Sequence, residues 1–481
     1  MKQDGVKSIL KNTVYLSSAR AATSLARLVY VALLAKILGA ELYGLLAYAM
    51  SWYLIFIPVS VFGIDTLLIR GVGRDRNRAP LLIGQTLVLR SITSLVVGVL
   101  CLLIGLWAEP EPSSRTLLFV FSVALVGRSL ALWSNAVFIA HESSGFVLGQ
   151  EVVFRLLEVL VGISALLAGF GVIEIALIHA ASWLLQGTAG QILIRRHLLS
   201  VSPHWEAPAL FGLLKDGLPF VLSAFLIAWL MQGPIVLYAQ VLGVGAELGQ
   251  LALAIQALFI IGVIASEISG PAIPVLSRSV DREDGKTSQF VDLMLRSGIV
   301  MGGLLAVSGL TAGDWLIDLL FGDAYQETAS ILPWTLMLVT PFFWSSTLSA
   351  VITAHGRYWL LTLCRAIGAL VFTIAIPLIG TSFGLLGVIL ALGAGLIALS
   401  VCQLLVLRQY YVIDLFLLFG RTLVVIFGAF FVSKTLVPHN IWLALIAGII
   451  ILVSFGFVTG VLQKKELKTG SRFLLSVIKG R

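Results

Sequence analysis

Charged residues are scarce in this chain: only 12% of its 481 residues are Asp, Glu, Lys or Arg. Soluble globular proteins carry about 25% charged residues and about 45–50% apolar ones. This chain is instead 59% hydrophobic, which is too apolar to form a water-facing surface. The composition therefore excludes a soluble globular enzyme, and it leaves room for a dozen or more membrane-spanning helices at about 20 residues each.

Motifs for nucleotides and metals are also missing. The sequence has no G-x-x-x-x-G-K-[ST] segment, so it has no P-loop of its own to bind ATP. It has no H-E-x-x-H motif, and Cys101, Cys364 and Cys402 lie in apolar runs at no metal-ligand spacing. We expect no catalytic residues, no cofactor and no metal. Because the basic residues form no stripe, we also expect no nucleic-acid partner.

Apolar windows of about 19 residues predict an all-α, polytopic membrane protein with about fourteen transmembrane helices. With the N-terminus on the cytoplasmic side, nearly all loop Lys and Arg residues fall inside, and only Lys36, Arg115 and Lys434 fall outside. The C-terminus is then also cytoplasmic. The predicted spans are 14–38, 44–68, 81–106, 116–140, 147–168, 172–194, 216–241, 248–275, 288–311, 329–353, 358–379, 383–407, 415–436 and 440–462.

The chain contains an internal repeat at an offset of 204 residues. This shift aligns Lys11 with Lys215 and the Ala-x-x-Leu-Gly segment ending at Gly39 with the one ending at Gly243. Six spans separate the copies, an even number, so both copies enter the membrane in the same direction. We predict two six-helix lobes related by a pseudo-two-fold axis along the membrane normal. The predicted parts are lobes at 1–200 and 201–410, two further helices at 411–462 and a basic cytoplasmic tail at 463–481.

Several predicted spans contain arginine, at a cost of about 2.5–3.5 kcal/mol per charge on insertion scales. In the first span, polar residues recur every three or four positions and so share one helix face, which predicts an aqueous cavity. Guanidinium keeps its charge when desolvated and binds phosphate through paired hydrogen bonds. We therefore predict an anionic substrate bound by Arg20, Ser24, Arg27, Arg90, Arg128, Arg155, Arg296 and Arg365.

Acidic residues inside the spans allow two interpretations. Glu267, followed by two prolines, is the first candidate to bind a coupling proton or cation, and Glu158 and Asp65 are further candidates. Alternatively, Glu267 is a neutral acid in a tertiary hydrogen bond, and the arginines are structurally paired. The pairs would be Arg155 with Glu158, Arg296 with Asp292, and Arg20 or Arg27 with Asp65.

Short sequence segments between about residue 11 and residue 360, which we call landmarks, resemble segments of Wzx-type polysaccharide flippases. They occur in the same order and at the same topological positions as in that family. These flippases belong to the multidrug/oligosaccharidyl-lipid/polysaccharide exporter superfamily. Members often carry an acid late in the seventh span, where this chain reads Met231-Gln232-Gly233-Pro234-Ile235. The landmarks are Leu38 to Gly44, Gly63 to Asp65 with Arg70, Lys215 to Pro219, Pro271 to Arg278, Phe321 to Tyr325 and Ala354 to Arg357.

The resemblance implies that the chain flips an undecaprenyl-pyrophosphate-linked glycan to the outer leaflet of the bacterial inner membrane. The product would serve surface polysaccharide synthesis, such as O-antigen, lipopolysaccharide or exopolysaccharide. Alternating access would be coupled to H⁺ or Na⁺, as in an antiporter, with membrane lipids and other polysaccharide-assembly membrane proteins as partners. Two alternatives remain: a lipid II-type or small-molecule exporter of the same superfamily, and a membrane polymerase or glycosyltransferase that uses polyprenyl-linked sugars.

Overall fold

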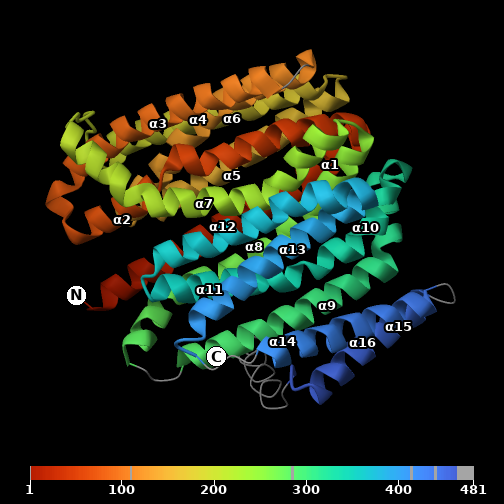
Figure 1. The fold of residues 1–481 in the computed structure, drawn as a ribbon. Coiled ribbons are helices and arrows are strands. Elements are labelled where there is room, and N and C mark those ends of the chain that lie inside the picture. The colour runs from red at the N-terminus through yellow and green to blue at the C-terminus, as the bar shows by residue number, and fades with distance from the viewer. Residues whose placement is uncertain (1, 109–110, 283–285, 412–414, 438–440, 463–481) are drawn as a thin grey trace. The chain divides into compact units, whose positions relative to one another are not determined.

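We describe the fold from a computed structural model, for residues 2–108, 111–282, 286–411, 415–437 and 441–462 (Figure 1). Within residues 1–25 and 263–286, only some side chains are described. The helices are α1 (Lys2–Val61), α2 (Ile64–Arg74), α3 (Ala79–Ala108), α4 (Pro112–Ala140), α5 (Ser144–Leu167), α6 (Val172–His197), α7 (Ala207–Leu242), α8 (Ala246–Arg282), α9 (Lys286–Phe321), α10 (Gln326–Met337), α11 (Val339–Ala354), α12 (Tyr358–Ala375), α13 (Thr381–Leu407), α14 (Leu415–Thr422), α15 (Gly428–Leu436) and α16 (Ile441–Val458).

The predicted spans lie largely within these helices, and two of them, 14–38 and most of 44–68, fall on the single long helix α1. Eleven helical segments among the described residues are long and apolar enough to cross a membrane. The first of them, Ala26–Arg74, contains parts of two predicted spans. The helix α5 is not among the eleven, and it carries Glu151, Arg155 and Glu158. The prediction of an all-α, multi-pass membrane protein is confirmed.

Two glycines related by the 204-residue offset share an unusual backbone conformation. Gly39 interrupts α1 with φ 74° and ψ 171°, and Gly243 ends α7 with φ 95° and ψ 171°. L-residues with a Cβ rarely adopt such positive φ values, so both positions favour glycine. The repeat read from the sequence therefore has a local counterpart in the backbone, while the symmetry of whole lobes remains a prediction.

The chain forms two compact units, residues 1–252 and 253–481. In the first unit, α4 packs on α3 and α6, and α1 packs on α4, α5 and α7. In the second unit, α9 packs on α10, α11 and α16, and α13 packs on α11 and α12. The helix α7 therefore belongs to the first contact unit, although the repeat assigns it to the second predicted lobe.

Apolar side chains point outward from the first unit, and polar ones point inward. On α3, Leu95 and Leu103 are 57% and 56% exposed, whereas Arg90 and Ser94 are fully buried. This is the reverse of a soluble protein, whose surface must offer polar groups to water. Lipid tails are apolar, so a membrane helix can expose leucine and must bury charge against other helices.

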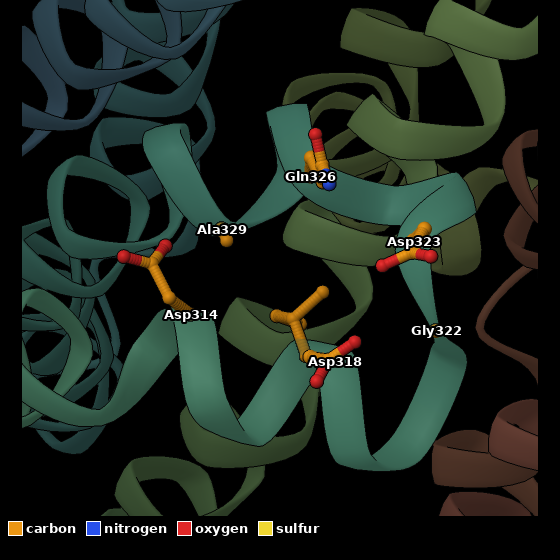
Figure 2. Close-up of a pocket in the computed structure, with 7 residues that line it drawn as sticks. Asp314, Asp318, Gly322, Asp323, Gln326 and Ala329 are labelled. Carbon is orange, nitrogen blue, oxygen red and sulfur yellow. The ribbon is translucent and has the colours of Figure 1, made fainter.

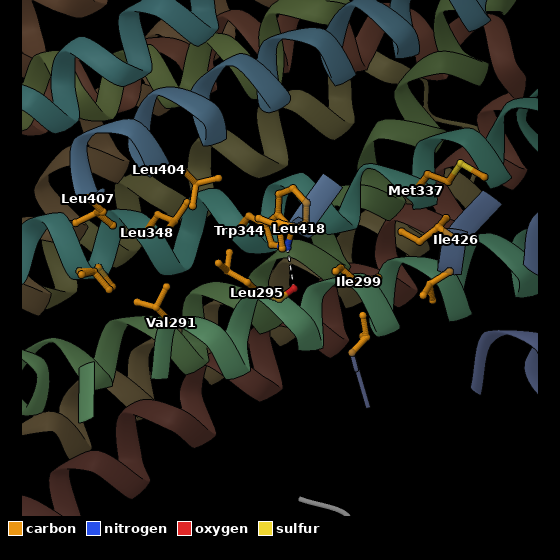
Figure 3. Packing of buried hydrophobic residues seen from close by; sticks show 14 of the residues in the cluster. Val291, Leu295, Ile299, Met337, Trp344, Leu348, Leu404, Leu407, Leu418 and Ile426 are labelled. Atoms are coloured by element: carbon orange, nitrogen blue, oxygen red, sulfur yellow. Dashed lines mark hydrogen bonds between the residues drawn. The ribbon is translucent and has the colours of Figure 1, made fainter. Parts of the chain in front are cut away.

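The second unit has an apolar core between α9, α11 and the last helices of the chain (Figure 3). Trp344 of α11 is buried there, and its indole Nε1 donates a hydrogen bond of 2.8 Å to the Leu295 carbonyl of α9. Leu418, Ile426 and Leu452 bring α14, the π-helical segment Leu423–Phe427 and α16 into the same cluster. The last helices are thus packed on α9.

Candidate functional site

Three charged residues of α5 share one face, because Glu151, Arg155 and Glu158 are spaced four and three positions apart. Within the first unit, this face meets α6. Arg155 and Glu158 form an ion pair, and their side chains are only 15% and 5% exposed. The sequence-based expectation that Arg155 pairs with Glu158 is confirmed.

A stripe of α6 completes the surroundings of Arg155. His179, Ser182, Trp183 and Gln186 are spaced so that they also lie on one helix face. Arg155 Nη2 donates to Ser182 Oγ and to Gln186 Oε1, both at 3.1 Å. Its guanidinium also lies 3.9 Å from the centre of the Trp183 ring, which is cation–π contact. Both terminal nitrogens of Arg155 are therefore engaged by the protein.

Glu158 is held from two sides. One carboxylate oxygen contacts Arg155, and the other lies 2.7 Å from His179 Nδ1. His179 in turn accepts a hydrogen bond of 3.1 Å from the indole Nε1 of Trp183. A buried carboxylate is tolerated in a membrane span only when such donors replace water.

Arg128 of α4 faces the same tryptophan. Its guanidinium lies 5.0 Å from the centre of the Trp183 ring and 5.4 Å from that of Tyr53, and its Nη1 donates to the Tyr53 hydroxyl at 3.3 Å. Among the described residues, no carboxylate pairs with it, and its buried Nε has no hydrogen-bond partner. Arg128 thus differs from Arg155, because its positive charge is not neutralised by a described neighbour.

Arg27 of α1 joins this group. Its side chain is exposed, and the charged or ionisable groups acting on it electrostatically include Arg128, Tyr53 and Glu158. Two like charges held close together repel unless an anion lies between them. The structure therefore gathers Arg27, Arg128, Arg155 and Glu158 in one cluster, which we call the α1/α4/α5 arginine site.

Two glycines bring α4 and α6 together beside this site. A Cβ placed on Gly127 would lie 2.6 Å from the Leu184 nitrogen and 2.8 Å from the Trp183 carbonyl carbon. A Cβ on Gly187 would lie 2.8 Å from the Gly127 carbonyl oxygen. Small residues allow such close helix packing in membranes. Arg128 and Trp183, each next to this contact, are thereby brought within cation–π distance.

The Gly127→Ala substitution is expected to destabilise the protein by about 1–3 kcal/mol, because its new methyl group meets backbone atoms that cannot move independently. Thermal unfolding in detergent measures this loss. Gly149→Ala is the matched control, since a Cβ on Gly149 meets nothing within 4 Å and the position is helical. Equal melting temperatures for the two variants would contradict the close-packing argument.

Two other predicted site residues pair with each other away from this cluster. Arg90, fully buried on α3, forms an ion pair with Asp65 near the start of α2, and its Nη1 lies 3.5 Å from Ser129 Oγ. The sequence predicts Arg20 or Arg27 as the partner of Asp65, whereas the described partner is Arg90, and the side chain of Arg20 lies outside the described residues. Arg90 therefore has a structural partner within its own unit.

The remaining predicted residues fall into two groups. In the second unit, Arg296 pairs with Asp292 at 2.9 Å, as expected, and Arg365 Nη2 lies 3.5 Å from Ser349 Oγ. The side chains of Arg20, Ser24 and Glu267 lie outside the described residues, as does the predicted tail at 463–481. Their predicted roles in substrate binding and coupling stay predictions.

Sequence reasoning missed the contribution of α6. His179, Ser182, Trp183 and Gln186 follow the i, i+3, i+4, i+7 pattern of one helix face, which is a readable signal in an otherwise apolar span. A histidine inside a span is ionisable and, like the arginines, indicates a functional site. Tyr53 had no such signal, because a tyrosine in a span is common and only tertiary packing places it beside Arg128.

A cavity of about 370 Å³ lies elsewhere, in the second unit, where α9 ends and α10 begins (Figure 2). It is lined by Asp314, Asp318 and Asp323, with Gln326 nearby. No three His, Cys, Asp or Glu side chains within the described part of the chain are placed to hold a metal ion. Because its lining is acidic, this cavity is unsuited to a phosphate-bearing substrate.

The sequence matches one known protein family. The family described as polysaccharide biosynthesis protein matches residues 9–280, more than half of the chain. The chain belongs to this family. No curated protein matches it at a significant level.

Solved structures show the fold. A lipid II flippase, MurJ, in an inward closed conformation is similar with a TM-score of 0.69 at 14% identity, over 93% of this chain and 98% of that one. A MOP superfamily transporter from Pyrococcus furiosus has a TM-score of 0.61 at 13% identity, over 84% and 95%. A mutant of the Vibrio cholerae MATE transporter VcmN has a TM-score of 0.59 at 16% identity, over 84% and 97%. The chain therefore has the fold of these transporters.

Proposed function

We propose that this protein flips an anionic, polyprenyl-pyrophosphate-linked oligosaccharide from the cytoplasmic to the outer leaflet of the bacterial inner membrane. The observation that carries the proposal is the position of Arg128, a cation within a membrane-spanning helix that also acts electrostatically on Arg27. Arg128 has no described carboxylate partner, and its Nε lacks a hydrogen-bond partner. A pyrophosphate supplies both the missing negative charge and the missing acceptors.

The family supports surface polysaccharide synthesis as the pathway, with an undecaprenyl-linked repeat unit of O-antigen, lipopolysaccharide or exopolysaccharide type as the substrate. The fold supports transport by alternating access, in which a ligand biases the equilibrium between two states. We propose H⁺ or Na⁺ as the coupling ion, cytoplasmic termini, and membrane lipids and other polysaccharide-assembly membrane proteins as partners.

Lipid II-type flipping is the second candidate, because the similar structure with a TM-score of 0.69 is a lipid II flippase. Both substrates carry a polyprenyl pyrophosphate and differ in the sugar, so the arginine site accommodates either. Export of a small cationic molecule is disfavoured by the two neighbouring cations. We propose a transporter rather than a polymerase or glycosyltransferase, since the acidic cavity at α9 and α10 has no residue suited to binding a pyrophosphate.

Reconstituted protein tests this proposal directly. Proteoliposomes are loaded with fluorescent undecaprenyl-pyrophosphate oligosaccharides or with fluorescent lipid II, and the fraction reaching the other leaflet is measured with an impermeant quencher. We expect protein-dependent flipping of the oligosaccharide. Faster flipping of lipid II than of any oligosaccharide would favour the second candidate. A folded protein that moves no member of the panel would overturn the flippase proposal.

A further inference from the structure

His179 occupies a position that defines its protonation state. Its Nε2 accepts the 3.1 Å hydrogen bond from Trp183 Nε1, and its Nδ1 lies 2.7 Å from Glu158 Oε1. An indole N–H can only donate, so Nε2 must offer a lone pair. The proton of the ring is therefore on Nδ1, where the Glu158 carboxylate accepts it. These two contacts fit a neutral imidazole.

We infer that His179 is a proton-binding site whose protonation state is transmitted to the arginine site by Trp183. A second proton can enter the ring only at Nε2. There it would face the N–H of Trp183, and two donors cannot share a hydrogen bond at 3.1 Å. Protonation must therefore break the bond between His179 and Trp183, while the bond to Glu158 remains and becomes charge-assisted.

Trp183 connects this event to the cations. Its ring lies 3.9 Å from the guanidinium of Arg155 and 5.0 Å from that of Arg128. A tryptophan that loses its hydrogen bond can turn, and these cation–π contacts then change. Arg128 is the residue proposed above to bind the pyrophosphate. The link to substrate rests on that proposal, whereas proton binding at His179 does not.

Helices on three sides of His179 present ionisable groups to it. The helix α5 contributes Glu158, which contacts the ring, and Arg155, which pairs with Glu158. The helix α4 contributes Arg128, and α1 contributes Tyr53, whose ring packs edge-on against the imidazole, and Arg27. Further groups at the edge of this network are Tyr30 of α1, which Glu158 and Arg155 influence, and Glu151 of α5, which accepts from Gln186. Among the described residues, Glu158 is the carboxylate that contacts the ring.

Fluorine NMR of protein labelled with 5-fluorotryptophan tests the inference in nanodiscs without any glycan. The Trp183 resonance is identified by its loss in Trp183→Phe. We follow it from about pH 5 to about pH 8 and expect a shift in one step in the wild type and no step in His179→Gln. Trp133 and Trp344 are internal controls, because their indoles donate to Thr86 Oγ1 and the Leu295 carbonyl, which do not titrate.

A second measurement tests the inference if the His179→Gln variant does not fold. In ¹⁵N-histidine spectra, Trp183→Phe removes the hydrogen bond to His179 Nε2, so the Nε2 resonance of one histidine should move at a pH where the other histidines are unchanged. A Trp183 resonance that stays constant over this range in folded protein would overturn the inference. A step that persists in His179→Gln would also overturn it, because another group would then be titrating. Neither outcome bears on whether the protein moves a glycan.

Discussion

Arg128→Ala is expected to weaken the apparent affinity for the lipid-linked oligosaccharide by about tenfold or more and to lower flux accordingly. A hydrogen bond to a charged group contributes about 1.5–3 kcal/mol, and about 1.4 kcal/mol corresponds to a factor of ten. Arg128 has donors to offer because no described carboxylate occupies it. Initial flipping rates at several substrate concentrations in proteoliposomes give both quantities.

Two variants control for this result. Arg128→Lys keeps the charge but loses the paired donors, so its affinity should lie between those of the wild type and Arg128→Ala. Arg76→Ala removes an arginine from an exposed pair with Glu142 and should leave flux unchanged. If Arg128→Ala folds normally and flips substrate at the wild-type rate and affinity, the pyrophosphate does not bind at Arg128.

Glu158→Gln is expected to lower the free energy of unfolding by about 3–5 kcal/mol. Removing one partner of a buried ion pair leaves the other charge uncompensated, and such losses are usually of this size. Here the remaining charge is Arg155, whose side chain is 15% exposed. Chemical denaturation in mixed micelles, followed by circular dichroism, measures the change.

The double variant Glu158→Gln with Arg155→Met separates charge from packing. Replacing both members of a buried pair with uncharged residues is often close to neutral, so the second substitution should recover much of the stability. Glu142→Gln breaks the exposed pair with Arg76, whose side chains are 51% and 72% exposed, and should cost less than about 1 kcal/mol. A Glu158→Gln protein as stable as Glu142→Gln would show that the pair contributes little.

Part of the site was readable from α5 alone. Arg155 and Glu158 are three positions apart, and a helix brings such residues together whatever surrounds it, so their pairing was predicted and observed. The same holds for Asp292 and Arg296 on α9. The partner of Asp65 was not predicted, because Arg90 is on a different helix and only the packing of α2 against α3 brings the two together.

The sequence by itself determined that this protein is a multi-pass helical membrane protein, because the bilayer dictates the length and apolar character of each span. It also determined which residues carry charge into the membrane. The packing of the helices against one another determines which of those charges have a partner of opposite charge on another helix. Arg90 pairs with Asp65 of another helix, and Arg128 faces Trp183 and Tyr53, since contacts between helices depend on close approaches such as Gly127 against α6. Periodicity along one helix does not specify such approaches.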